Sequence, residues 1–185
     1  MSIKSAKTRV VIASLGALAV VGGVTGVSAY AGAEPAEAKP AAAVADINSD
    51  DIAGSKSLTS QAALKAAKAA LAEADKQGER VTVAVVDRAG NTIMLVKGDG
   101  AGPQTEDSAV EKAFTAVSFG KKTSELTEGA TGDAPNISDI PGTLFLAGGV
   151  PVTADKAPIA GIGVGGAPSG DIDESIAEAG RKAID

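Results

Sequence analysis

The chain of 185 residues has no cysteine and no histidine, and each absence excludes a class of chemistry. Without cysteine no disulfide can form, so stability must come from core packing and from any oligomerisation. Without histidine there is no Ser-His-Asp or Cys-His catalytic arrangement, and no zinc site built from histidine and cysteine. The composition therefore excludes most familiar hydrolase mechanisms.

Aromatic side chains are also scarce, being limited to Tyr30, Phe114, Phe119 and Phe145. The core must then consist of alanine, valine, isoleucine and leucine in close contact. Glycine occurs 23 times, and together with the abundant alanine it predicts elements that pack at short distances.

The N-terminal segment has the organisation of a secretory signal peptide. Lys4, Lys7 and Arg9 precede the apolar run 10–29, which ends in the small-residue site Ala29-Tyr30-Ala31. We expect residues 1–31 to be removed and the protein to be secreted; the alternative is an uncleaved membrane anchor.

Removal of residues 1–31 takes away three cations and no acids, which moves the formal net charge from −6 to −9. A chain this acidic is a poor partner for nucleic acid or for anionic lipid surfaces. Residues 32–56 are rich in Ala, Glu, Pro and Asp without a sustained apolar period, which predicts a flexible acidic tether. The folded domain is expected at 57–185.

The domain is organised around residues 81–96, where two apolar runs flank the polar tract 87–91, a pattern typical of a β-hairpin. Both faces of the first arm are apolar, so we expect it to be covered on both sides. The order of elements predicts an α+β fold, with an antiparallel sheet of about five strands flanked by helices. The other expected elements are helices at 59–77, 106–119 and 171–184, a helical turn at 123–126, and strands at 143–147, 148–152 and 159–165.

The last expected strand has an unusual face. Gly161, Gly163 and Gly165 share one side by the two-residue period, so that side carries almost no side chains. Such a run indicates either tight packing against a helix or a subunit, or a flat ligand. Gly161, Gly163 and Gly166 also match G-x-G-x-x-G, but no further strand follows to complete a dinucleotide-binding unit.

Three residues of the expected helix 106–119 lie off its apolar stripe. They are Lys112, Thr115 and Phe119, which we expect to face a partner or a pocket. Lys112, one helical turn before Thr115, could bind a carboxylate such as a propionate. The alternative is a solvated surface lysine.

Several tracts, taken together and in order, resemble the GlcG/HbpS-like haem-binding family, which includes the C-terminal module of PduO-type proteins. The resemblance covers about 58–184, and it rests on residues 84–91, 99–101, 112–116, 119–120, 123–126, 148–152, 161–166 and 173–174.

The resemblance implies an oligomer, from dimers to octamers, that binds haem. Export places the chain with the HbpS branch, whose extracellular haem-binding proteins are associated with membrane sensor kinases of two-component systems in redox or iron sensing. Asn91 stands where many relatives carry histidine, so the axial ligand would have to be Met94, Lys112, Thr115 or a carboxylate, or there would be none; Thr115 is favoured. The predicted cofactor-binding residues are Thr115, Lys112, Phe119, Met94, Arg88, Gly161 and Gly163.

Two other functions stay open at this point. The family is also described as haem-degrading, which would make the chain a small enzyme acting on haem or on a small carboxylate, although no recognisable catalytic set is present. Alternatively, the chain is a structural assembly protein without a ligand, whose glycine-faced strand packs against a neighbouring subunit.

Overall fold

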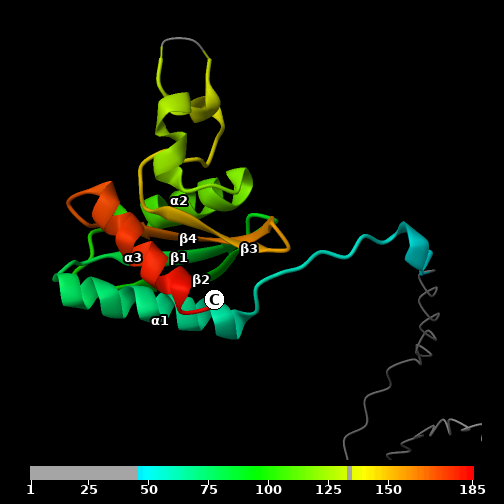
Figure 1. Ribbon diagram of the computed structural model, residues 1–185, viewed down its shortest axis with the longest axis horizontal. Helices are drawn as coiled ribbons and strands as arrows, with labels where there is room; N and C mark the ends of the chain where they lie inside the picture. Colours follow the sequence, from blue (N-terminus) through cyan, green and yellow to red (C-terminus); the bar gives the residue numbers. More distant parts are fainter. Residues whose placement is uncertain (1–45, 133–134) are drawn as a thin grey trace, which may run out of the picture. The chain divides into compact units, whose positions relative to one another are not determined.

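Residues 46–132 and 135–185 are described by a computed structural model, and within them four strands form an antiparallel sheet with the order β2-β1-β4-β3. Helix α2 lies on one face of this sheet, and α1 and α3 lie on the other (Figure 1). The strands are β1 (Thr82–Asp87), β2 (Thr92–Lys97), β3 (Gly149–Ala154) and β4 (Ala157–Gly165), and the helices are α1 (Ser60–Gln77), α2 (Thr105–Phe119) and α3 (Gly170–Lys182). This confirms the predicted α+β class.

The predicted signal peptide 1–31 and residues 32–45 of the tether lie outside the described residues. The described end of the tether is exposed and contains a single short 3-10 helix, Ser49–Asp51, capped by the side chain of Asn48.

The first helix begins and ends where its capping residues predict. The Thr59 side chain accepts a hydrogen bond from Ala62 N at 3.2 Å, which satisfies a donor that the first turn leaves free. Gly78 ends the helix with φ of 74°, a left-handed conformation that glycine adopts without steric cost. The buried face of α1 consists of alanines, which lets α3 pack closely on it.

Strand β1 is buried on both faces, as its two apolar patterns predict. Val83 and Val85 belong to the core between the sheet and helices α1 and α3. Ala84 and Val86 belong to the core beneath α2. The hairpin to β2 turns at residues 87–91, where the Asp87 carboxylate accepts hydrogen bonds from the backbone of the turn.

The glycine face of β4 is filled by α2 of the same chain. A Cβ added at Gly161 or Gly163 would overlap the backbone carbonyl oxygens of Ala113 or Ala109, respectively. A Cβ at Gly165 would lie 2.8 Å from Ser108 Oγ. Of the interpretations that the sequence allowed, tight helix packing is the one realised, and the packing is internal rather than between subunits.

The strand expected at 143–147 does not form, so the described sheet has four strands and not about five. Two backbone groups of this segment bond to side chains and not to a neighbouring strand. Leu144 N donates to Thr115 Oγ1 at 2.8 Å, and Phe145 O accepts from Thr127 Oγ1 at 3.3 Å.

The segment between α2 and β3 contains two 3-10 helices, Thr123–Ala130 and Ile137–Asp139, and projects from the sheet on the α2 side (Figure 1). The helical turn expected at 123–126 is therefore confirmed and is longer than predicted. Helix α3, expected from residue 171, begins at Gly170 and is capped by Ser169, whose Oγ accepts a hydrogen bond from Ile172 N at 3.4 Å.

Candidate functional site

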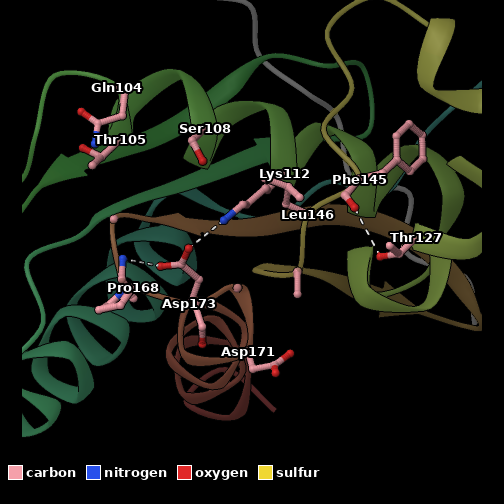
Figure 2. Close-up of a pocket in the computed structure, with 15 residues that line it drawn as sticks. Gln104, Thr105, Ser108, Lys112, Thr127, Phe145, Leu146, Pro168, Asp171 and Asp173 are labelled. Atoms are coloured by element: carbon pink, nitrogen blue, oxygen red, sulfur yellow. Dashed lines mark hydrogen bonds and ion pairs between the residues drawn. The ribbon is translucent and has the colours of Figure 1, made fainter. Parts of the chain in front are cut away.

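A cleft of about 440 Å³ lies where the first half of α2, the segment 145–147 and the start of α3 meet. Figure 2 shows α2 above this cleft and α3 below it, with Lys112 and Asp173 pointing toward each other between them. The lining of the cleft includes polar residues such as Ser108 and the apolar residues Leu146 and Ala147. A second hollow of about 370 Å³ also has Leu146 in its wall.

The floor of the cleft is a buried ion pair. Lys112 Nζ lies 2.7 Å from Asp173 Oδ2 and donates to Val164 O at 3.0 Å. Asp173 Oδ1 accepts from Ala167 N at 3.0 Å. The pair therefore joins α2 to α3 and to the end of β4.

Burial raises the pKa of the Asp173 carboxyl, and the hydrogen bond and charge of Lys112 oppose that rise. With only 3% of Lys112 exposed, its ammonium is held by the protein and is not free to take a ligand carboxylate. Lys112 lines the cleft, as expected of a residue that faces a pocket. The alternative of a solvated surface lysine is wrong, because an acid on another helix draws its side chain inward.

Thr115 is also buried, with none of its surface exposed, and its hydroxyl has two partners. Thr115 Oγ1 donates to Glu111 O at 2.7 Å and accepts from Leu144 N at 2.8 Å. Residue Phe119, one turn further, packs edge-to-face against Phe145 with ring centroids 5.5 Å apart. Thr115 and Phe119 thus hold the segment 143–147 against α2.

The other predicted binding residues lie elsewhere. Met94 is half-buried on the α1 side of the sheet, opposite the face that carries α2. Arg88 lies in the β1–β2 turn and donates to Pro158 O at 2.8 Å. Gly161 and Gly163 are covered by α2, which leaves no room for a ligand on their face within the subunit.

Asp173 is the principal site residue that sequence reasoning missed as a functional group. It shares the inward-facing side of α3 with Ile176, Ala177 and Gly180, which recur at helical spacing. An acid on an otherwise apolar or small-residue face predicts a buried cationic partner, and this pattern could have identified it.

In residues 46–132 and 135–185 no group of three or more Asp or Glu side chains is placed to hold a metal ion. The helices in these ranges are also too short or too polar to cross a membrane.

The fold and the cleft define a small α+β module in which one helix packs on glycines of a four-stranded sheet and is tied to the opposite layer by a buried ion pair. A family model described as "Haem degrading protein HbpS-like" matches residues 58–182. The chain belongs to this family, which confirms the resemblance found in its sequence.

Two solved structures and one curated protein illustrate the relationship. A double mutant of HbpS from Streptomyces reticuli is 57% identical, with a TM-score of 0.76, and the match covers 79% of this chain and 99% of that one. The PduOC–haem complex is 26% identical with a TM-score of 0.65, covering 70% of this chain and 96% of that one. An uncharacterised 15.0 kDa protein of Citrobacter freundii is 31% identical over 113 residues, which is 59% of this chain and 80% of the relative.

Proposed function

We propose that this chain is an exported, oligomeric haem-binding protein that serves a membrane sensor kinase in redox or iron sensing. The observation that carries the haem part of the proposal is the family membership, together with the likeness to a PduO-type module solved with haem. When bound, haem supplies an iron whose oxidation state and ligands can change, which is what a redox or iron sensor requires.

The residues of the cleft fit haem in part. Leu146, with 59% of its surface exposed, and Ala147 offer apolar contact to a flat ring. Lys112 is held by Asp173, so the propionates must find other partners. Thr115 is fully buried and does not line the cleft, so it would reach the iron only after Leu144 N releases its hydroxyl and the segment 143–147 moves away from α2.

The test is a haemin titration of residues 32–185, followed by absorbance in the Soret region. We expect a saturable change with the unmodified chain and at least about tenfold weaker binding with Thr115→Ala, which corresponds to about 1.4 kcal/mol. Thr115→Ser should bind like the unmodified chain because it keeps the hydroxyl. Thr131→Ala, which changes an exposed threonine in the wall of the second hollow, is the matched control.

A change that does not saturate in any of these proteins would remove haem from the proposal. Equal affinity of Thr115→Ala and the unmodified chain would keep haem and remove Thr115 as its ligand. Export and the kinase partnership have separate tests, namely recovery of the processed chain from the culture medium and co-purification with a sensor kinase from membranes.

The description of the family as haem-degrading favours a second function, turnover of the bound haem. A time course after the titration distinguishes the two. A carrier keeps a constant Soret band, whereas an enzyme loses it and forms a product in the presence of a chelator. If turnover depends on the buried ion pair at the floor of the cleft, Lys112→Ala abolishes it.

A further inference from the structure

The charges of the cleft oppose the entry of a carboxylate. The charged residues in its lining are one cation, Lys112, and two acids, Asp171 and Asp173, which gives a formal net charge of −1. Lys112 Nζ lies 2.7 Å from Asp173 Oδ2 and also donates to Val164 O, so the charge of its ammonium is already balanced. Among the described residues that line the cleft, no cation remains for a ligand carboxylate.

Asp171 is the acid of the cleft whose charge is not balanced. It lies two residues before Asp173 in the first turn of α3, and it is exposed. Figure 2 shows both acids on α3, with Asp173 directed at Lys112. Within residues 46–132 and 135–185 the Asp171 carboxylate has no hydrogen bond or ion pair. A ligand carboxylate that enters the cleft therefore meets an unpaired negative charge.

The starts of the two helices that meet at the cleft do not offer an anion site either. The first N–H groups of a helix attract anions, and both α2 and α3 begin beside the cleft. However, the first turn of α2 carries Glu106 and Asp107. The first turn of α3 carries Asp171 and Asp173. These carboxylates already interact with the positive helix ends and would repel a further anion.

The wall formed by residues 145–147 has the opposite character. Phe145, Leu146 and Ala147 line the cleft, and Leu146 keeps 59% of its surface exposed. Phe145 and Leu146 also line the second hollow, where Leu144 adds another apolar side chain. The two hollows thus share an apolar wall, which gains from contact with an uncharged, flat ligand.

We propose that the cleft accepts the uncharged edge of a flat ring and that Asp171 excludes edges that carry carboxylates. For haem, the edge opposite the propionates enters between α2 and α3, and both propionates stay in solvent. The apolar wall supplies the attraction, and the acids at the helix starts supply the discrimination between the two edges.

The alternative is that the propionates enter and bind polar groups of the cleft. Ser108 is a donor in the lining, on the same helix as Lys112 and one turn before it. Its hydroxyl supplies a hydrogen bond without a positive charge, whereas a carboxylate taken out of water needs a paired charge or several hydrogen bonds. The two orientations predict different effects when the propionate charge is removed.

This inference rests on the haem part of the proposed function, and its tests separate the two. If neither haemin nor its dimethyl ester gives a saturable Soret change, both the haem proposal and this inference fall. If haemin binds and the ester does not, haem stays as the ligand and the assigned orientation is overturned.

The first test compares the affinities of the full chain for haemin and for haemin dimethyl ester, in which both propionates are neutral. We expect the ester to bind within about fivefold of haemin or more tightly, because no propionate contact with the protein is lost. Binding of the ester that is weaker than this would mean that the cleft holds the propionates, and the proposal would be wrong.

The second test is Asp171→Asn, which removes the repelling charge and keeps the shape of the side chain. We expect about threefold tighter binding of haemin and no gain for the ester. The matched control is Asp155→Asn, in the turn before β4 and at the opposite end of this strand from the cleft. Its exposed carboxylate pairs with Lys56, and its loss should leave both affinities unchanged.

Circular dichroism checks that both variants are folded. If Asp171→Asn leaves haemin affinity unchanged, or if the ester gains as much as haemin, Asp171 does not discriminate between the edges and its assigned role is overturned.

Salt provides a third readout on the unmodified chain. Added NaCl screens exposed charges, since the Debye length falls from about 30 Å at 0.01 M to about 3 Å at 1 M. Repulsion between the propionates and the acids predicts that haemin affinity rises with salt relative to that of the ester. A ratio of the two affinities that stays constant or falls would contradict the proposal.

Discussion

The two faces of β4 achieve close packing in opposite ways. On one face, glycines at 161, 163 and 165 allow the backbone of α2 to lie directly on the strand. On the other face, Ile162 and Val164 fill the space beneath α1 and α3 with side-chain volume. The first face therefore tolerates no added atom, whereas the second is sensitive to atoms removed.

The ion pair between Lys112 and Asp173 connects these two layers at the end of the sheet. Lys112 belongs to α2, on the glycine face of β4. Asp173 belongs to α3, on the opposite face, which carries Ile162 and Val164 and is called here the side-chain face. The difference between the two faces of β4 can thus be tested at three places: the Lys112–Asp173 ion pair, the glycine face and the side-chain face.

The largest effect is expected from breaking the connection. Asp173→Ala leaves the Lys112 ammonium buried without its carboxylate, which should lower the free energy of unfolding by about 3–5 kcal/mol in urea titrations. Glu106→Ala, which removes the exposed pair with Lys97, should change it by less than about 1 kcal/mol.

The double variant Lys112→Met with Asp173→Leu sharpens this prediction. It should recover most of the stability lost in Asp173→Ala, because no unpaired charge remains buried. A double variant no more stable than Asp173→Ala would mean that the pair's geometry, and not its charge balance, holds the layers together.

The second-largest loss of stability is expected from a change on the glycine face. Gly163→Ala places a methyl group against Ala109 O and should lower the free energy of unfolding by about 3 kcal/mol. Gly54→Ala, at a position with open space around it, is the control and should change stability by less than about 0.5 kcal/mol. If both variants unfold at the same urea concentration, α2 must be able to shift away from β4.

The smallest loss of stability is expected from a change on the side-chain face. Ile162→Val removes one methyl group from a fully buried position and should lower the free energy of unfolding by about 1 kcal/mol. The same urea titration measures it. A loss as large as that of Gly163→Ala would show that the two faces are equally intolerant and that the contrast drawn between them is wrong.

Local chemistry explains why much of the fold could be predicted. Thr59 and Gly78 mark the ends of α1, and the apolar runs on either side of residues 87–91 define the hairpin. The bare face at Gly161 and Gly163 was visible by period alone. Period alone could not decide what covers that face, because the covering helix is distant in the sequence.

The site was less predictable because its contacts are non-local. Lys112 and Asp173 are separated by 61 residues, and Thr115 and Leu144 by 29. On a helix considered alone, Lys112 and Thr115 look free to face a partner or a pocket. The prediction of a strand at 143–147 was wrong for a related reason, since side chains of Thr115 and Thr127 bond two of its backbone groups.

The order of the strands also has a consequence for how the chain reaches this fold. The pairs β1–β2 and β3–β4 are each joined by short turns, so their ends meet with little loss of chain entropy. The pair at the centre, β1–β4, joins strands from opposite ends of the folded unit, with Thr82 beside Gly165. Helix α2 lies between the two hairpins in the sequence and rests on both central strands, so its docking brings the two hairpins together. We expect the middle of the sheet to form after the two hairpins, because its pairing closes a longer loop.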